Sequence, residues 1–127
     1  THSRNIADVN IIDETVAEKI TCHGFPGFSI DDHESYKTFF RVFRQSFTDM
    51  DWTVHALVAD ETHVSARWEI HATFSGDFAG VKADGRRIRF DGMVLYRMER
   101  GLIAETWLHI NEMVRLSQIG AVPALGA

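Results

Sequence analysis

Residues 64–74 (VSARWEIHATF) form the stretch that decides the fold of this chain. Apolar and polar residues alternate along it, which is the two-residue period of a β-strand with one face in a core. The apolar side consists of Val64, Ala66, Trp68, Ile70, Ala72 and Phe74. The polar side consists of Ser65, Arg67, Glu69, His71 and Thr73. The segment therefore predicts a long, half-buried β-strand.

The same period of two recurs before and after this segment. Turns are predicted at residues 60–62, 84–85 and 100–101. Further strands are predicted at residues 18–23, 52–56, 88–96 and 102–110. Gly92 lies inside one of them, which indicates a bulge or a close approach of another group to the backbone.

The clearest helical segment begins near Asp31, which with Glu34 has the spacing of a capping box. An aromatic stripe follows at helical spacing: Tyr36, Phe39, Phe40, Phe43 and Phe47. Shorter helical stretches are predicted over residues 11–16 and around Met113, Leu116 and Ile119. Helices followed by a run of antiparallel strands predict an α+β fold in which the aromatic stripe packs on the sheet.

Length and composition limit the functions to consider. The 127 residues fit a single domain, residues 1–127, with residues 1–7 expected to be loose. The net charge of −5 argues against nucleic-acid binding, and no apolar run reaches the ~20 residues that span a membrane. The single cysteine, Cys22, excludes an intrachain disulfide and favours the cytoplasm. We expect neither a metal nor a cofactor, because no metal-binding motif is present.

An ordered series of motifs over residues 10–123 resembles the SnoaL-like polyketide cyclases of the NTF2-like superfamily. Thr48 stands where that family has a proline, Phe74 where it has a histidine, and Asp84 where it has a threonine. The matching stretches are residues 43–50 (FRQSFTDM), 64–68 (VSARW), 73–86 (TFSGDFAGVKADGR), 96–101 (YRMERG), 105–107 (ETW) and 118–120 (QIG).

The resemblance implies a cone in which a curved antiparallel sheet packs on helices around an apolar pocket for a small apolar or aromatic ligand. The first helix of the family is expected to be shortened or missing. The mouth of the pocket would then be open or covered by a second subunit, and the family implies a homodimer.

Catalytic candidates come from the end of the chain. Asn111 occupies the position at which the cyclases carry an acid/base aspartate; an amide cannot transfer a proton near neutral pH, but it can donate a hydrogen bond to a carbonyl or enolate oxygen. It also stands where a helix N-cap belongs. His109 is the titratable substitute, unless it is an ordinary polar residue on an open strand.

Asp91 is a third candidate, because a carboxylate in an apolar strand can act as a general base; the alternative is an ion pair with Arg89 or Arg97. Ligand binding is predicted for a set of aromatic and histidine residues: Trp107, His23, Phe40, Trp68, Tyr96, Phe74 and His71.

Three functions follow as hypotheses. The first is an enzyme that uses acid/base chemistry on a small apolar carbonyl compound, in the manner of aldol cyclases and isomerases. The second is a protein that binds such a compound without turnover, because the catalytic aspartate is replaced by Asn111. The third uses an exposed sheet face as a protein interface. A fold alone does not decide among them.

Overall fold

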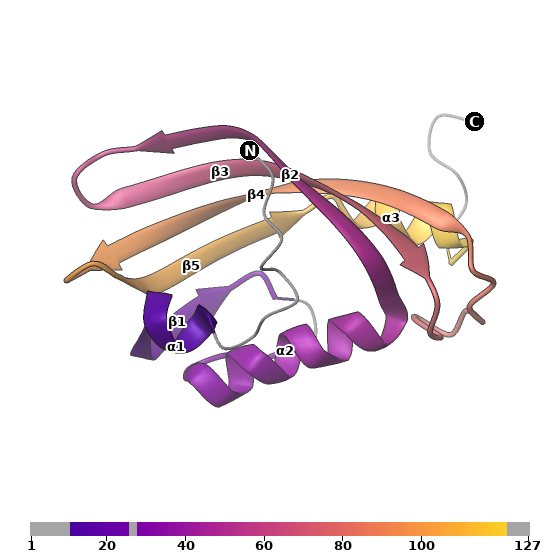
Figure 1. The fold of residues 1–127 in the computed structure, drawn as a ribbon, viewed down its shortest axis with the longest axis horizontal. Coiled ribbons are helices and arrows are strands. Elements are labelled where there is room, and N and C mark those ends of the chain that lie inside the picture. The colour runs from indigo at the N-terminus through magenta and orange to yellow at the C-terminus, as the bar shows by residue number, and fades with distance from the viewer. Residues whose placement is uncertain (1–10, 26–27, 122–127) are drawn as a thin grey trace.

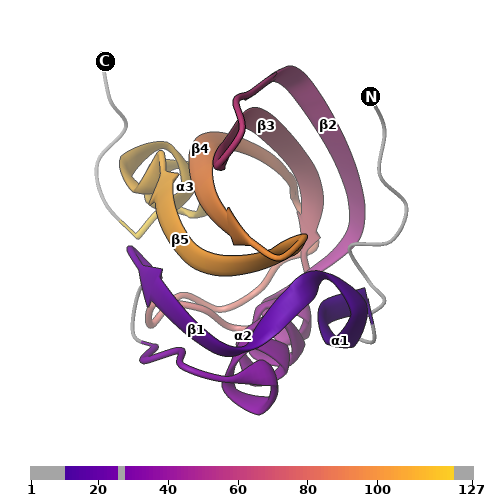
Figure 2. The same cartoon turned by 90° about the vertical axis from the view of Figure 1, so that its left-hand side faces the viewer.

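The described part of the chain forms a five-stranded sheet and three helices. The computed structural model describes residues 11–25 and 28–121. Along the chain the elements are α1 (Ile11–Thr15), β1 (Val16–His23), α2 (His33–Ser46), β2 (Phe47–Ala59), β3 (His63–Phe74), β4 (Arg87–Glu99), β5 (Leu102–Ile110) and α3 (Glu112–Ile119). The long strands arch over α2 in Figure 1, and Figure 2 shows how strongly the sheet curls. The predicted α+β fold with a curved sheet is confirmed.

The sheet is mixed, with strand order β1-β5-β4-β3-β2. Strands β2 to β5 pair antiparallel in chain order, as predicted. The predicted sheet is entirely antiparallel, and this is wrong for β1, which pairs with β5 in parallel. Thr21 lies opposite Glu105, and His23 lies opposite Trp107. Alternation of residue types predicts a strand but not its neighbour. The parallel pair places side chains from both ends of the chain side by side.

Helix α2 begins one residue later than predicted. Its N-cap is Asp32, whose Oδ1 accepts a hydrogen bond from the Ser35 backbone N–H at 2.8 Å. The Ser35 hydroxyl accepts in return from the Asp32 backbone N–H at 3.2 Å. The predicted capping box of Asp31 and Glu34 is therefore wrong by one position, because a serine side chain closes the box here.

The core lies on the inner face of the sheet, by which we mean the face toward α2. Phe47, Phe74 and Phe90 are its largest fully buried side chains. Alternate residues of β3 and β4 are buried along this face, as predicted. Ala56 was predicted to face the same side as Val54 but is exposed, because the register of β2 against β3 shifts between these two residues. The extra residue of such a bulge reverses the alternation.

A glutamine side chain links helix α3 to the backbone of β4. Oε1 of Gln118 accepts from the backbone N–H of Arg89 at 2.7 Å, and its Nε2 donates to the backbone carbonyl of Arg89. Pairing between β4 and β5 extends only to Gly92. The glutamine therefore satisfies backbone groups that β5 leaves open, and α3 covers this end of the sheet.

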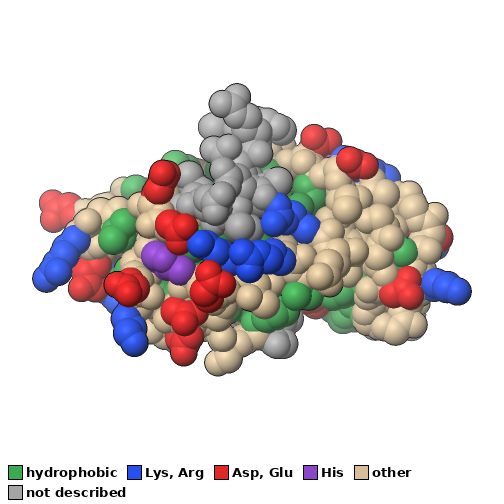
Figure 3. All heavy atoms as spheres, turned by 60° about the horizontal axis from the view of Figure 1, so that its bottom comes forward, with side chains coloured by type: hydrophobic (Ala, Val, Ile, Leu, Met, Phe, Trp, Pro, Cys, Tyr) green, Lys and Arg blue, Asp and Glu red, His purple; other side chains and the backbone are tan. Residues whose placement is uncertain are grey.

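Helix α1 spans five residues and is tied to α2 by an ion pair between Asp13 and Lys37 with an O–N distance of 2.8 Å. The expected loose segment, residues 1–7, lies outside the described residues. The face that carries α1 and α2 shows acidic and basic side chains next to each other and hydrophobic ones only in small separate areas (Figure 3). Such a mixed surface is typical of a solvated face.

Candidate functional site

A cavity of about 70 Å³ lies between the inner face of the sheet and α2, and we call it the inner cavity. Helix α2 and strands β3 and β4 supply most of its wall. Its lining residues are Phe25, Tyr36, Phe39, Phe40, Phe43, Trp52, Trp68, Ile70, Phe90, Val94, Tyr96, Leu108, Ile110 and Arg115. A second cavity, also of about 70 Å³, shares Phe39, Phe43, Ile110 and Arg115 with it.

Three of the predicted ligand-binding residues meet at the inner cavity. Phe40 comes from α2, Trp68 from β3 and Tyr96 from β4. Phe74 lies in the core instead, where its ring centroid is 5.8 Å from that of Phe47 and its side chain is fully buried. The inner cavity therefore brings together part of the predicted set, and ligand binding by these residues stays a prediction.

Three of the residues that line the inner cavity, Trp52, Tyr36 and Tyr96, carry a side-chain hydrogen-bond donor. Nε1 of Trp52 is buried and has no hydrogen-bond partner among the described residues. Burial raises the pKa of the Tyr96 hydroxyl to about 12 and the pKa of the Tyr36 hydroxyl well above its usual value of 10. Both phenols therefore stay protonated at neutral pH and retain an O–H donor.

The most unusual residue at the cavity is Arg115, which sequence reasoning missed. It belongs to α3 and is only 4% exposed. Its position four residues before the buried Ile119 was a usable signal, because residues four apart share one face of a helix. The guanidinium carbon lies 4.7 Å from the ring centroid of Phe78 and 5.4 Å from that of Phe90.

No side chain that accepts a proton near neutral pH is found among the described residues that line the inner cavity. Within the described ranges, its lining contains no carboxylate and no imidazole. The catalytic candidates lie on the outer face of the sheet, which points away from α2. His109 is exposed there, between two β5 residues, Leu108 and Ile110, that line the inner cavity.

The outer face does bring the three catalytic candidates together. They share a shallow hollow of about 370 Å³, which we call the outer hollow. Nδ2 of Asn111 donates to Oδ1 of Asp91 over 3.3 Å, whereas neither predicted arginine partner forms an ion pair with Asp91 among the described residues. The hollow is lined by Arg67, Asp91, Gly92, Met93, His109, Ile110 and Asn111.

Two more predicted ligand residues meet elsewhere on the outer face. The His23 ring stacks on the Trp107 indole with centroids 5.4 Å apart. Nε2 of His23 lies 2.7 Å from Oε2 of Glu105, and Arg97 Nε contacts Oε1 of the same carboxylate at 3.1 Å. These contacts lower the pKa of Glu105, with the His23 hydrogen bond as the largest cause. The parallel pairing of β1 with β5 creates this cluster.

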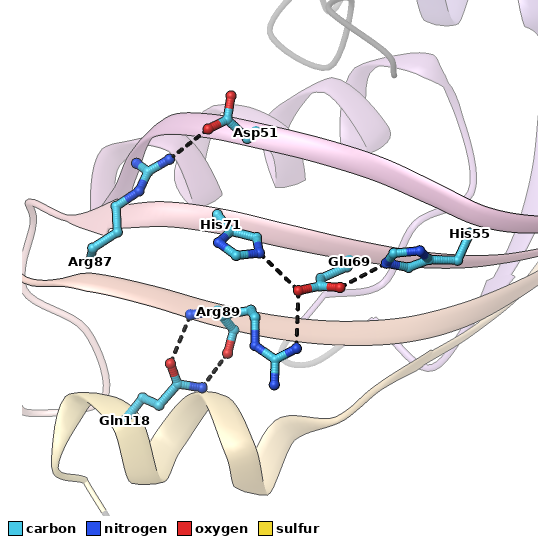
Figure 4. A network of polar contacts seen from close by, with 7 residues as sticks. All are labelled: Asp51, His55, Glu69, His71, Arg87, Arg89 and Gln118. Atoms are coloured by element: carbon cyan, nitrogen blue, oxygen red, sulfur yellow. Dashed lines mark hydrogen bonds and ion pairs between the residues drawn. The ribbon is translucent and has the colours of Figure 1, made fainter. Parts of the chain in front are cut away.

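His71, the last predicted ligand residue, belongs to a polar network on the same face (Figure 4). The carboxylate of Glu69 contacts Nε2 of His55 at 2.7 Å and Nε2 of His71 at 2.8 Å. Arg89 Nη1 adds a third contact at 3.1 Å. The hydrogen bonds from His55, Arg89 and His71 lower the pKa of Glu69 to about 2. Each of these polar atoms is already engaged, so the network is a structural ladder across three strands.

Three further properties bear on function. Within residues 11–25 and 28–121, no group of three or more His, Cys, Asp and Glu side chains is arranged to hold a metal ion. No helix in that part of the chain is long and apolar enough to cross a membrane. Burial raises the pKa of the Cys22 thiol to about 12, so this thiol is a poor nucleophile.

A family model and solved structures both relate this chain to the same family. The family described as SnoaL-like polyketide cyclase matches residues 2–119. No curated protein matches the chain. Among solved structures, IdmH from Streptomyces antibioticus is 26% identical with a TM-score of 0.79, and the match covers 91% of this chain and 89% of IdmH.

Two other solved structures, both below 25% identity, support the fold. TsrD from Streptomyces laurentii is 22% identical with a TM-score of 0.83, and the match covers 93% of this chain and 87% of TsrD. A SnoaL-like polyketide cyclase from Agrobacterium tumefaciens is 22% identical with a TM-score of 0.74, and the match covers 91% of this chain and 88% of that protein.

Proposed function

The chain belongs to the SnoaL-like polyketide cyclase family, and we propose that it binds a small, largely aromatic carbonyl compound in the inner cavity. The observation that carries this proposal is the composition of the cavity wall, in which aromatic rings surround a few hydrogen-bond donors. Rings offer a large apolar area and stacking contacts, and a few polar groups then fix the orientation of the ligand.

The unpartnered donor of Trp52 favours a ligand with an oxygen acceptor. A buried N–H without a partner costs about 1–3 kcal/mol, and Nε1 of Trp52 is such a group among the described residues. A carbonyl oxygen would supply the missing acceptor. The protonated hydroxyls of Tyr36 and Tyr96 can donate to the same kind of oxygen.

The size of the cavity limits the ligand. An apolar cavity of ~150 Å³ accommodates benzene, and each of the two cavities here has about half that volume. Phe39 and Phe43 border both cavities, so rotation of their rings would join them into room for one aromatic ring. A compound of two or more rings requires α2 to move away from the sheet.

Binding without turnover is the function that this geometry supports best. Acid/base catalysis needs a proton acceptor within hydrogen-bond reach of the substrate. The described lining of the inner cavity offers donors, but neither a carboxylate nor an imidazole. Asn111, at the position of the family's aspartate, contacts Asp91 on the outer face instead.

A second candidate function is acid/base catalysis at the outer hollow, and the contact between Asn111 and Asp91 favours it. In this proposal His109 or Asp91 moves the proton, and Asn111 donates to the carbonyl or enolate oxygen of the substrate. Turnover would then follow one ionisation. Activity that persists in both His109→Ala and Asp91→Ala would exclude this candidate.

A thermal-shift screen tests the main proposal, with aromatic acids, aromatic ketones and steroids as probes. A ligand at about 100 times its Kd adds ~2.7 kcal/mol of stability, which raises the Tm of a domain of this size by several degrees. The matched variants are Phe40→Ala in the inner cavity and Trp107→Ala on the outer face. A shift that disappears in Phe40→Ala and persists in Trp107→Ala supports binding in the inner cavity; the reverse moves the ligand to the outer face.

We further propose that the protein forms a homodimer through the outer face. Met93 and Leu95 are large hydrophobic residues exposed there, at 50% and 36%. They line a shallow hollow of about 390 Å³ together with Trp107. Burial of such side chains against a second copy would be favourable. A cytoplasmic location stays a prediction that rests on the single cysteine.

A further inference from the structure

Arg115 places a positive charge at the wall of an otherwise apolar cavity. Its side chain is 5% exposed, and it lines both the inner cavity and the second cavity. Four phenylalanine rings surround its guanidinium carbon at centroid distances of 4.7 to 6.0 Å: Phe43, Phe47, Phe78 and Phe90. Rings stabilise a cation through their negative faces, but they accept no strong hydrogen bonds.

The ion pair of Arg115 leaves much of its hydrogen-bonding capacity unused. Nε and Nη2 both contact one oxygen, Oε1 of Glu112, at 2.5 Å. An arginine fork normally engages both oxygens of a carboxylate in parallel bonds. Within the described residues, Nη1 contacts no acceptor, and Glu112 is itself 32% exposed at its side chain. The guanidinium therefore retains donors for a second anion.

Stability alone does not explain a charge at this place. A buried ion pair is often no more stable than well-packed apolar side chains of the same volume. The guanidinium lies among aromatic rings, where a methionine or leucine side chain would also pack. What the arginine adds is a fixed cation with free donors at the edge of a cavity lined by aromatic rings.

We propose that Arg115 makes the inner cavity a site for aromatic acids, an inference that rests on the proposed ligand-binding function. The ring of the ligand packs against the phenylalanines, and its carboxylate, phenolate or enolate oxygen pairs with the free side of the guanidinium. Glu112 is the internal anion that competes for the same cation. Arg115 thus determines specificity for charged over neutral aromatic compounds.

Calorimetric titration with matched probes tests this proposal. Benzoate and benzamide have the same ring and differ in charge, and 2-naphthoate and 2-naphthamide form a larger pair. Fluorescence gives an independent readout, because Trp52 and Trp68 both line the cavity. We expect the folded wild-type protein to bind each acid at least tenfold more tightly than its amide, because hydrogen bonds to charged groups are the stronger ones.

Three variants differ in their expected effects on the affinities for the acid and the amide. Arg115→Met removes the preference for the acid and leaves the affinity for the amide within about twofold. Glu112→Gln removes the internal competitor, so it strengthens acid binding several-fold. Arg67→Met is the matched control, because Arg67 is an exposed arginine that lines the outer hollow. It leaves both affinities unchanged.

The outcomes separate the inference from the function on which it rests. Equal binding of acid and amide by the wild-type protein, or a preference that survives in Arg115→Met, overturns the role of Arg115 but leaves the cavity as a ligand site. A preference lost in Arg67→Met instead places the anion on the outer face and also overturns the inference. If no probe binds any variant while all variants keep the wild-type unfolding profile, the proposed function fails and the inference fails with it.

Discussion

Nδ2 of Asn111 donates a hydrogen bond to Oδ1 of Asp91 over 3.3 Å, at the point where β5 ends and α3 begins. The backbone N–H of Asn111 also donates to the Asp91 carbonyl at 2.9 Å. Asn111 occupies the N-cap position of α3, but its side chain makes no capping hydrogen bond. The amide is therefore engaged by a carboxylate on the neighbouring strand, and a second carboxylate at this position would face Asp91 directly.

We predict that Asn111→Asp, which restores the residue type of the family's cyclases, lowers stability at pH 7. Two carboxylates at this separation repel each other, and at a partly exposed site the cost is about 0.5–1 kcal/mol. Thermal unfolding at pH 7 should show a Tm lower by a few degrees than that of the wild-type protein. The double variant Asp91→Asn with Asn111→Asp recreates one carboxylate facing one amide, so it should recover the wild-type Tm. A deficit that persists in the double variant would contradict this explanation.

Gly92 allows the Trp68 indole to lie directly against β4. A Cβ at this position would come within 2.5 Å of Cζ2 of Trp68 and 2.5 Å of the His109 carbonyl oxygen. We therefore predict that Gly92→Ala displaces the indole and costs roughly 1–3 kcal/mol, as overpacking does. Urea unfolding gives the free energy, and ligand-induced Trp fluorescence reports the change at the cavity wall. Gly101→Ala is the control: it meets no atom within 4 Å but has a φ of +78°, so it should cost ~1 kcal/mol through its backbone without changing ligand binding.

Burial on one face explains why so much of the sheet could be predicted. The strand predicted at residues 102–110 is β5, and the close approach predicted at Gly92 is the contact with Trp68. The parallel pairing of β1 with β5 could not be predicted, because it joins segments distant in sequence whose alternation fits several neighbours. The exposure of Ala56 follows from a bulge that no residue type in β2 indicates.

The candidate site was harder to predict than the fold, because it depends on which face of β5 turns inward. The sequence-based prediction places Trp107 and His109 in one site with Phe40, Trp68 and Tyr96, but the sheet separates the two sets. The sequence contained a signal: Ala104, Thr106, Leu108 and Ile110 form the more apolar of the two alternating rows of β5. That row faces α2 and leaves Trp107 outside. Aromatic character alone therefore did not identify the side that lines the cavity.

Glu69 should contribute to the free energy of unfolding at neutral pH, and this contribution should be lost at low pH. Its pKa is about 2 in the folded protein, below its ordinary value of 4.5, with the His55 hydrogen bond as the largest cause. A carboxylate whose pKa is lower in the folded protein stabilises the folded state fully at pH values above its pKa in the unfolded chain. This contribution is lost as the pH falls through the pKa of the folded protein. We predict that the free energy of unfolding of the wild-type protein falls between pH 4.5 and pH 2 more steeply than that of Glu69→Gln.

Urea unfolding at pH 5, 4, 3 and 2 measures this difference. The matched control is Glu61→Gln, which removes an exposed carboxylate in the turn between β2 and β3. It should leave the acid dependence close to that of the wild-type protein. If Glu69→Gln and the wild-type protein lose stability in parallel over this range, the contacts of Glu69 with His55, His71 and Arg89 do not stabilise the folded state.

Trp107 should control self-association of the chain. Its indole lies on the outer face, where the His23 ring covers one side and the exposed Met93 and Leu95 adjoin the same hollow. Tryptophans are enriched among the central interface residues whose truncation to alanine costs ~2 kcal/mol or more. Sedimentation equilibrium of the wild-type protein at micromolar concentration should show a dimer, and Trp107→Ala should raise the dimer Kd at least ~30-fold. Leu57→Ser is the comparison, because Leu57 is 66% exposed at the far end of β2. A dimer weakened by Leu57→Ser but not by Trp107→Ala would place the interface at the β2–β3 hairpin, and a wild-type monomer would exclude the homodimer.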